Sequence, residues 1–266
     1  MPVILGGNTG IYLASLTPSV DPDAQAFITA AAITDPTQQS AINTLVVDLK
    51  GYNVWTKMKA VYPFVGGTAS AHKFNLKDPR DLDVAFRLTW HGGGTWTANG
   101  YKPNGMNGYA DTKITSASLG TSSLSMWYYS RENIGTNTLI GNANKLFFTP
   151  ILTANSNAYY ALNSDFQGGT ATFIPSNFSG LLGLNRTGTS NFKAFRNGAS
   201  YKTLASVTGA GTEAGNITLF QRNGVGQHTA NQCAFASIGD GLTDTEAANL
   251  YTAVQAFQTT LNRQIP

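Results

Sequence analysis

The chain has 266 residues, enough for one large all-β domain or two small ones with a sizeable core. Charged residues make up only 12%, about half of the ~25% typical of globular proteins. The net charge of +3 comes from 17 basic and 14 acidic residues spread along the sequence. The sequence has no Lys/Arg cluster to follow phosphates and no run of ~18 apolar residues, which argues against a nucleic-acid partner and against membrane insertion.

Cysteine usage and the first residues predict folding in a reducing cytosol. The single cysteine, Cys233, excludes a disulfide within the chain, and its apolar neighbours predict a buried packing residue rather than a reactive thiol. The sequence starts Met-Pro-Val-Ile-Leu-Gly-Gly, without the basic and long apolar regions of a secretory signal. We therefore expect synthesis in the cytoplasm without a signal peptide.

The N-terminal region predicts an apolar segment and then two short helices. Residues 1–20 have no helical period and fit either an edge strand of the domain or an extended arm docked on a partner. Asp21-Pro22 and Asp35-Pro36 each place a cap before proline at the first helical position. The second helix, which should stop at Gly51, carries one apolar stripe made of Ile42, Leu45, Val46 and Leu49. Such stripes must pack on the sandwich or on a neighbouring subunit.

From Lys57 onward the hydrophobic period is two, which indicates β-strands. One predicted strand runs from Lys57 to Phe64, and a second, half-buried strand runs from Asp83 to Trp90. A long Gly- and Asn-rich loop is expected from His91 to Asn107. Further strands are predicted at Tyr109–Ile114, Leu124–Arg131, Lys145–Thr149, Ala158–Leu162, Ala171–Ile174 and Leu181–Asn185. Their regular, short spacing favours a sandwich over alternating βα units.

The C-terminal third contains the strongest local signals. Asn197-Gly198, between two short alternating strands, predicts a hairpin with a type I′ turn. Strands follow at Asn216–Gln221 and Gln232–Ile238. A capping box at Thr243 and Glu246 then starts a helix predicted to reach Asn262. Its apolar stripe consists of Ala247, Leu250, Tyr251, Val254, Phe257 and Leu261.

This order of hairpin, strand, strand and capped helix resembles the laminin-G-like members of the concanavalin A-like jelly-roll superfamily. The segments that carry the resemblance are Phe192–Ser200, Ile217–Gln221 and Ala234–Tyr251. The acidic pair that the family has before the last strand is absent, and Asn231-Gln232-Cys233 stands there. The structural or calcium contact of the family is therefore not expected at that point.

Three further runs resemble a group of bacteriophage structural proteins, virion or tail-associated, with this fold: Tyr62–Thr68, His72–Asp83 and Asn107–Thr112. The resemblance implies an all-β, two-sheet antiparallel jelly-roll sandwich with N-terminal helices and a C-terminal helix. It implies a non-enzymatic virion protein, as capsid decoration, head fibre or tail fibre, located in the virion. Its partners would be other virion proteins and copies of itself.

We expect residues 1–55 to form an arm with two helices and residues 56–266 to form the jelly roll. The alternative function is a free monomeric carbohydrate-binding protein resembling a lectin. The N-terminal extension favours the virion subunit, because a particle subunit needs an attachment device and a free lectin has little need of one.

Catalytic patterns are incomplete in this sequence. His91-Gly92-Gly93-Gly94 matches the oxyanion loop of some esterases, but the required Gly-x-Ser-x-Gly elbow is missing. A retaining glycosidase needs two neighbouring carboxylates ~5 Å apart, and the glutamates, at Glu132, Glu213 and Glu246, are isolated from one another. An enzyme is the interpretation that fits least.

Metal-binding patterns are also weak. Asp78, Asp81 and Asp83 around Arg80 fit a calcium site or, as the favoured interpretation, a turn in which Arg80 neutralises the carboxylates. The histidines, His72, His91 and His228, are too scattered for a metal triad and fit loop or core positions. We expect neither a metal nor a cofactor.

The long loop carries the expected ligand site. A sugar needs a flat apolar ring and amide groups for hydrogen bonds, and the region Gly92–Asn107 offers both. Trp90 and Tyr109 lie on predicted strands and are assigned to the core. The predicted binding residues, on an exposed surface that touches host-surface glycans, are Trp96, Tyr101, Asn99 and Asn104. Weak contacts of this kind gain from multivalency.

Overall fold

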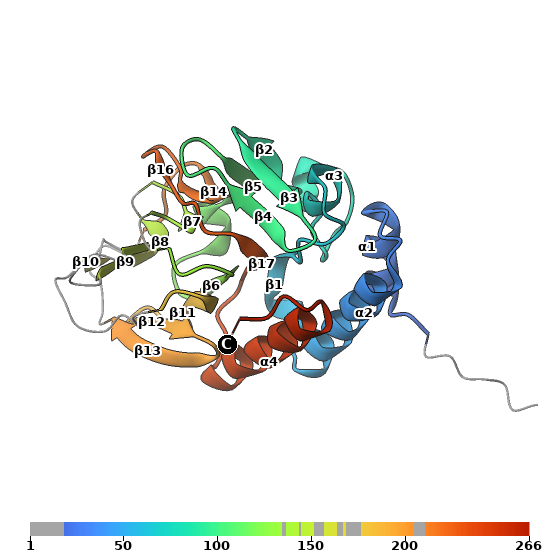
Figure 1. Cartoon of the computed structure of the whole chain (residues 1–266). Helices are drawn as coiled ribbons and strands as arrows, with labels where there is room; N and C mark the ends of the chain where they lie inside the picture. Colours follow the sequence, from blue (N-terminus) through green and yellow to red (C-terminus); the bar gives the residue numbers. More distant parts are fainter. Residues whose placement is uncertain are drawn as a thin grey trace, which may run out of the picture.

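The computed structural model describes residues 19–134, 137–143, 145–151, 157–163, 167–168, 177–204 and 211–265. These residues form two antiparallel sheets packed face to face, with helices on the outer face of one sheet (Figure 1). The predicted all-β jelly-roll sandwich with helices at both ends is thereby confirmed. No helix within the described ranges is long and apolar enough to cross a membrane.

The larger sheet has the order β13-β12-β11-β6-β17-β4-β3, and β1 pairs with β17 as an additional strand. Its strands are β1 (Met58–Tyr62), β3 (Gly94–Thr97), β4 (Gly100–Pro103), β6 (Leu124–Ser130), β11 (Gly180–Arg186), β12 (Phe192–Arg196), β13 (Ala199–Leu204) and β17 (Cys233–Gly239). Every described pair in it is antiparallel. The N-terminal and C-terminal parts of the sequence therefore meet in its centre.

The smaller sheet has the order β10-β9-β8-β7-β14-β5-β2. Its strands are β2 (Thr89–His91), β5 (Tyr109–Thr115), β7 (Ile140–Gly141), β8 (Leu146–Ile151), β9 (Asn157–Leu162), β10 (Gln167–Gly168) and β14 (Asn216–Leu219). A separate two-stranded ribbon joins β15 (Gln221–Arg222) to β16 (Gln227–His228). Short helical turns connect these elements: η1 (Trp55–Lys57), α3 (Ala69–His72), η2 (Asp83–Ala85) and η3 (Ser116–Leu119).

One hydrophobic core fills the space between the two sheets. Alternate residues of each strand point into it, as the period of two requires. From the larger sheet these include Tyr62, Met126, Tyr128, Leu182, Leu184 and Ile238. From the smaller sheet they include Ile114, Ile140, Phe148, Leu162, Ile217 and Leu219.

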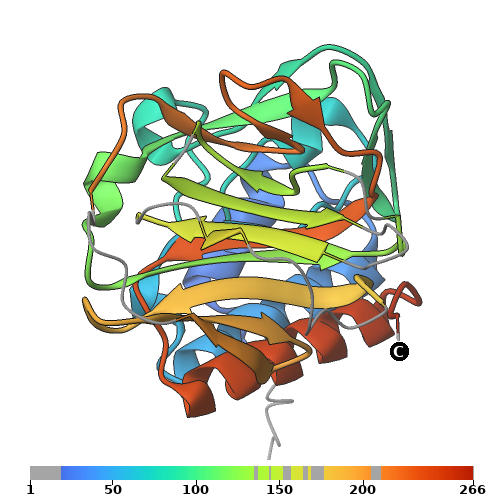
Figure 2. The same cartoon turned by 90° about the vertical axis from the view of Figure 1, so that its left-hand side faces the viewer.

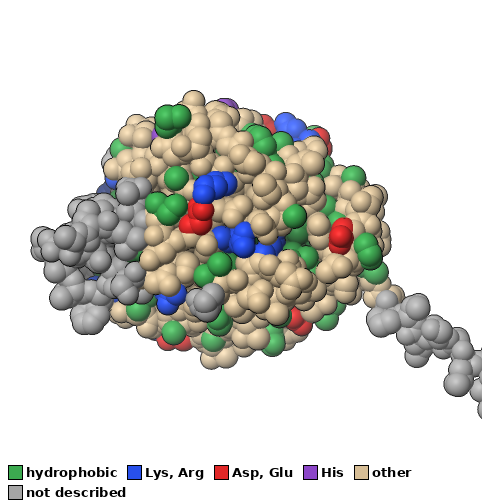
Figure 3. Space-filling view, viewed as in Figure 1, with side chains coloured by type: hydrophobic (Ala, Val, Ile, Leu, Met, Phe, Trp, Pro, Cys, Tyr) green, Lys and Arg blue, Asp and Glu red, His purple; other side chains and the backbone are tan. Residues whose placement is uncertain are grey.

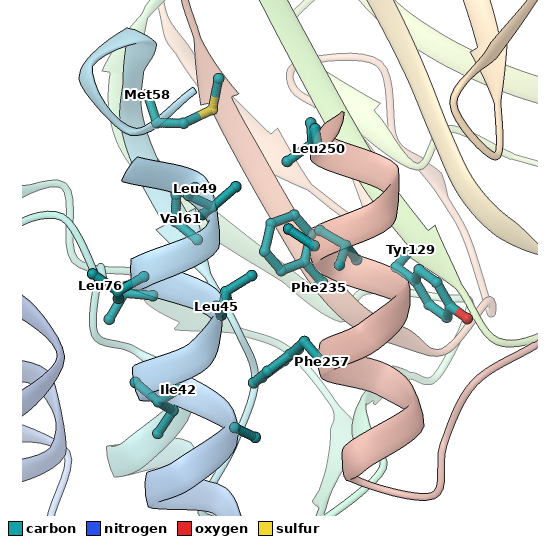
Figure 4. Close-up of a cluster of buried hydrophobic side chains, with 14 of the residues drawn as sticks. Ile42, Leu45, Leu49, Met58, Val61, Leu76, Tyr129, Phe235, Leu250 and Phe257 are labelled. Atoms are coloured by element: carbon teal, nitrogen blue, oxygen red, sulfur yellow. The ribbon is translucent and has the colours of Figure 1, made fainter. Parts of the chain in front are cut away.

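A second core lies between the larger sheet and three helices, α1 (Pro22–Ala30), α2 (Pro36–Gly51) and α4 (Asp244–Thr260). Figure 4 shows Leu45 and Phe257 pointing toward the space between α2 and α4, with Phe235 behind them. Figure 2 shows α4 running along the sheet. The remaining strand residues point here, so β6, β11 and β17 are buried at every position. The apolar stripes of the helices were predicted to pack on the sandwich or on a neighbouring subunit, and they pack on the sandwich.

The predicted helices begin where the sequence indicates, while α4 ends at Thr260, two residues before the predicted Asn262. The carboxylates of Asp21 and Asp35 accept hydrogen bonds from Asp23 N and Gln38 N, and proline follows each cap. α2 ends at Gly51. Helix α4 has both hydrogen bonds of the capping box between Thr243 and Glu246. These boundaries are local because a cap needs only neighbouring residues.

The predicted hairpin is also confirmed. Strands β12 and β13 meet at Asn197 and Gly198, whose φ angles are 49° and 78°. A type I′ turn requires positive φ at both central residues. The Asn197 side chain also accepts a hydrogen bond from Leu181 N at 3.0 Å, which ties the turn to strand β11.

The predicted strand from Asp83 to Trp90 is wrong in its first half. Residues Asp83–Ala85 form a turn of 3₁₀ helix, Phe86 adopts a left-handed conformation with φ of 59°, and only Thr89–His91 pair as β2. Val84, expected on the buried face, is 73% exposed. The alternation of apolar residues suggested a strand, but the segment forms a 3₁₀ turn instead. The backbone carbonyl of Asp83 accepts the Phe86 N–H and closes this turn.

The long loop predicted from His91 to Asn107 is wrong as well. Its middle is a tight hairpin of β3 and β4, in register from Gly94 opposite Pro103 to Thr97 opposite Gly100. Threonine, tryptophan and tyrosine are strand formers, so propensity outweighs the glycines that flank them.

Two predictions fall wholly or largely outside the described residues: the strand Ala171–Ile174, and the edge strand or arm over residues 1–20, of which the structure describes only the last two. The division at residue 55 stays a prediction. Residues 22–51 share one hydrophobic cluster with β1, β6 and β17, so α1 and α2 are not packed as a separate unit.

Candidate functional site

The predicted binding aromatics lie side by side but are not both accessible. Trp96 on β3 and Tyr101 on β4 are direct partners in the hairpin, with ring centroids 5.2 Å apart. Tyr101 is fully buried and its hydroxyl donates to Gly93 O at 3.3 Å. Burial raises the pKa of Tyr101 to about 12. Its prediction as an exposed residue is therefore wrong, because its position on β4 points it into the core between the sheets.

Trp96 is half-buried, and one side of its ring packs edge-on against Trp90 at 5.5 Å. Its Nε1–H is buried and has no hydrogen-bond partner in the part of the chain that the structure describes. Asn99 is exposed at the tip of the β3–β4 hairpin, where its backbone N–H donates to Thr97 Oγ1. Trp96 and Asn99 thus remain near one another on the edge hairpin.

Asn104 serves to hold the loop between β4 and β5. Its Oδ1 accepts three hydrogen bonds, each at 3.0 Å, from the backbone N–H groups of Met106, Asn107 and Gly108. Its Nδ2 donates to Asn107 Oδ1 at 2.7 Å, and that oxygen also accepts the Gly93 N–H. The loop is consequently fixed to the β2–β3 turn by amide side chains.

Glycine is required where these two loops meet. Gly92 has φ of +63°, and a Cβ built on it would lie 2.0 Å from Asn107 O. No residue other than glycine fits such an approach without moving the backbone. The result is a preorganised pair of loops that presents His91 and Met106 to solvent.

A group of three rings, which we call the ring row, lies beside these loops: His91, Tyr109 and His228. His91 and Tyr109 are direct partners on β2 and β5, and their rings stack with centroids 4.5 Å apart and planes 11° apart. His228, on β16, lies 6.0 Å from Tyr109. His91 is exposed, while Tyr109 and His228 are half-buried.

Sequence reasoning assigned Tyr109 to the core and His91 to an ordinary loop. The signal that could have found them is the alternation of β5, which buries Ala110, Thr112 and Ile114. Tyr109 then lies on the opposite face of β5 from these residues, and its half-buried ring also packs against the core between the sheets. Trp90 packs inward, so its neighbour His91 points outward to the same face.

Polar groups continue the outer face of β5 beyond the ring row. Lys113 has φ of +63° and lies in an irregularity between β5 and β14. Its backbone N–H and its Nζ both bond to the Asp111 carboxylate, at 2.8 and 3.1 Å. Asn216 Nδ2 donates to the same carboxylate at 3.0 Å. This arrangement places an amide and a charge pair beside the rings.

The acidic cluster near Arg80 is neutralised by basic side chains. Arg80 pairs with Asp78 at 2.5 Å, and Asp81 lies 2.6 Å from Lys73 and 2.7 Å from Arg87. The Arg80 guanidinium holds the pKa of Asp78 below its usual value. Among the described residues, no group of three or more His, Cys, Asp or Glu side chains could hold a metal ion.

The glutamates are engaged in separate structural contacts. Glu132 pairs with Lys102 and accepts the Gln232 N–H at 3.0 Å. Glu213 accepts the Lys145 N–H, and Glu246 caps helix α4. Each glutamate therefore has a local role on a different element.

Two buried groups are inert for different reasons. Cys233 is fully buried, as predicted, and burial raises the pKa of its thiol. His72 is 1% exposed, neither of its ring nitrogens has a hydrogen-bond partner in the described ranges, and burial lowers its pKa to about 3. Its ring packs edge-on against Phe64. Neither side chain reaches the ring row.

The face of the molecule drawn in Figure 3 has few charged side chains, and near its middle basic and acidic side chains lie next to one another. Binding of a phosphate backbone requires several clustered cations, and on this face the cations lie beside acidic side chains.

No protein-family model and no curated protein sequence matches the chain. Similar solved structures include domain 4 of AbnA, a GH43 extracellular arabinanase from Geobacillus stearothermophilus in complex with arabinotriose. That match has 14% identity and a TM-score of 0.44, and it covers 73% of this chain and 98% of that one.

The binding domain of Paraclostridial Mosquitocidal Protein 1 matches with 11% identity and a TM-score of 0.49, over 74% of this chain and 52% of that one. A structure on the entry of botulinum neurotoxin type C, described as dependent on two ganglioside molecules, matches with 14% identity and a TM-score of 0.47, over 76% and 52%. This chain spans about half the length of the two toxin structures.

Proposed function

We propose that this protein is a glycan-binding β-sandwich that acts by contact rather than by catalysis. The observation that carries the proposal is the ring row on the outer face of the smaller sheet, beside loops fixed by Asn104 and Asn107. The stacked rings of His91 and Tyr109 cover each other on one face, and their outer edges offer apolar CH groups and polar imidazole and phenol atoms to a sugar. The fixed loops reduce the ordering cost of binding.

The ring row replaces part of the binding surface expected from the sequence. Tyr101 is in the core and Asn104 is engaged within its own loop, so the expected set of four retains only Trp96 and Asn99 as candidates. A shallow surface of this size supports weak contacts, which become useful when several copies bind together.

Affinity electrophoresis through gels that contain soluble polysaccharides tests the proposal. We expect at least one polysaccharide to retard the native protein. His91→Ala and Tyr109→Ala should each weaken that retardation about tenfold, the change produced by ~1.4 kcal/mol. Asn99→Ala tests the β3–β4 hairpin independently of the ring row. Val84→Ala is the control, because it changes an exposed apolar residue on a different element.

Thermal unfolding of each variant controls for loss of structure. Retention lost in Asn99→Ala but not in the ring-row variants would move the site to the β3–β4 hairpin. Absence of retention by every polysaccharide, both in gels and with protein coupled to beads at high density, would contradict glycan binding.

The virion role rests on the sequence resemblance alone and stays a prediction, as do the virion location and the self-association. The N-terminal helices give the virion role little support, because α1 and α2 bury their apolar stripes within the domain and are not a free attachment device. Light scattering of the purified protein tests self-association: a trimer or larger assembly would support a particle subunit, and a monomer would favour the free lectin.

A further inference from the structure

In the described part of the chain, Arg186 and Arg263 are both 1% exposed. Arg263 shows how this fold completes a buried guanidinium, because each of its five N–H groups has an acceptor. The acceptors are Gln258 Oε1 for Nε, the carbonyls of Phe64 and Ala98 for Nη1, and those of Pro63 and Ala234 for Nη2.

Only one nitrogen of the Arg186 guanidinium has hydrogen-bond acceptors among the described residues. Its Nη1 donates to Thr121 O at 2.9 Å and to Asn163 O at 3.2 Å. Its Nε and Nη2 are buried and have no hydrogen-bond partner among the described residues. These two nitrogens form one edge of the guanidinium, and parallel N–H groups on such an edge match the two oxygens of a carboxylate.

The described surroundings of Arg186 supply no negative charge. It faces the core between the sheets, in line with Leu182 and Leu184, and its guanidinium lies 5.7 Å from the Phe192 ring. Burial lowers the pKa of Arg186, and no acidic group within the described ranges opposes that effect. A buried cation without a partner costs several kcal/mol, so the fold gains from an anion at this edge.

Arg186 lies at one end of the sandwich. It is the last residue of β11, and the next residue, Thr187, is exposed. In register it lies opposite Leu124, the first residue of β6, while Cys233, which follows the ring-row segment, lies opposite Ser130 at the far end. Arg186, on β11, and the ring row, on β2, β5 and β16, therefore lie on different strands and share no residue.

We propose that the free edge of Arg186 is a binding site for a small carboxylate. The oxygens of the ligand accept the Nε and Nη2 hydrogen bonds while Thr121 and Asn163 hold the other nitrogen in place. This site is separate from the proposed glycan surface and does not depend on it.

The test is nuclear magnetic resonance of the arginine Nε–Hε groups in the native protein, titrated with formate at constant ionic strength. The Arg186 signal, assigned through bonds, should shift and saturate, whereas the signal of Arg263, whose donors are all engaged, should not. The melting temperature should rise with formate and not with chloride. Arg186→Lys keeps the charge but lacks the paired edge, and the formate-dependent rise should be lost.

Two outcomes would overturn the proposal. An Arg186 signal that does not respond to formate, either in the native protein or in Asp165→Asn, means that water completes the guanidinium. The chain itself has a carboxylate at Asp165, two residues after Asn163 in sequence and outside the described residues. A response to formate that occurs only in Asp165→Asn means that the chain supplies its own carboxylate and that no external ligand binds.

Discussion

Individual buried polar residues hold distant parts of this chain together. Arg263, near the C-terminus, donates to carbonyls of β17, of the β3–β4 turn and of the segment after β1. Burial lowers the pKa of Arg263 to about 9, so the side chain is still a cation at neutral pH. Its five hydrogen bonds therefore make one residue the junction of three segments.

Replacing Arg263 should be among the most damaging single changes. Arg263→Lys removes the planar donor set and leaves several carbonyls without a partner, which should lower the free energy of unfolding by roughly 3–5 kcal/mol. Urea denaturation measures this value. Arg80→Lys, at an exposed ion pair, should leave it nearly unchanged. Similar values for the two variants would contradict the role of Arg263.

Turns and helix caps, which involve only neighbouring residues, define the secondary-structure elements of this fold. Contacts between elements then hold them in place. The hairpin turn at Gly198 packs against helix α4, because a Cβ there would lie 2.9 Å from Tyr251 Cβ and 3.1 Å from Ala248 Cα. Helix α4 starts at a capping box whose Glu246 also pairs with Lys57 at 2.6 Å. Turn, helix and the start of β1 are thus linked.

Gly198→Ala should destabilise the protein by about 1–3 kcal/mol, because it combines a positive φ with a steric contact. Gly188 does not have a positive φ, and a methyl group on its Cα would meet no atom within 4 Å, so Gly188→Ala should be nearly neutral. Thermal unfolding measures the melting temperature of both variants, and only Gly198→Ala should lower it. Equal melting temperatures would show that the turn tolerates a side chain.

Glu246 should add a pH dependence to stability. Burial raises its pKa, but bonds from Lys57 and Thr243 outweigh burial, so the net pKa is lowered from 4.5. A lowered folded-state pKa means that the stabilisation is complete above 4.5 and is lost as the pH falls through the folded value. Glu246→Gln, which keeps the cap, should unfold ~0.5–1 kcal/mol more easily at pH 7. The difference from the native protein should shrink below pH 4.5, and a constant difference would contradict this mechanism.

The whole molecule has three layers, with the larger sheet between the smaller sheet and the helices. Because α1 and α2 share one core with side chains of the larger sheet such as Val61 and Phe235, residues 56–266 alone would expose part of an apolar sheet face. The helices belong to the stability of the sandwich although they precede it in sequence.

We expect residues 56–266 to aggregate or to bind a hydrophobic dye rather than to fold as a stable domain. Leu45→Ala in the complete chain provides a graded version, and it should cost about 2–5 kcal/mol. Size-exclusion chromatography and thermal unfolding measure both. A cooperative transition of residues 56–266 at the native temperature would show that the helices are dispensable.

Much of the fold could be predicted because its signals are local. The caps at Asp21 and Thr243 and the Asn197-Gly198 turn involve residues that are adjacent in sequence. Strand Tyr109–Thr115 could be predicted from its period of two. Such patterns need no knowledge of distant partners.

The candidate site could be predicted only in part, because exposure depends on distant packing. Trp96 and Tyr101 share a polar, glycine-rich stretch, yet Tyr101 is covered by Phe220, far away in sequence. The pairing of His91 with Tyr109 requires β2 to pair with β5 across a loop that the sequence presented as irregular. In the sequence Arg186 looks like an ordinary residue at the end of a strand. That its Nε and Nη2 lack hydrogen-bond partners can be seen only in the assembled sheets.

The burial of β6, β11 and β17 on both faces also bears on how the protein opens in solution. Backbone amides in these strands can reach deuterated solvent only if a neighbouring layer detaches, whereas amides at the outer face of the smaller sheet need only small local fluctuations. The middle layer should therefore hold the slowest-exchanging amides, with exchange rates that report the free energy of global unfolding.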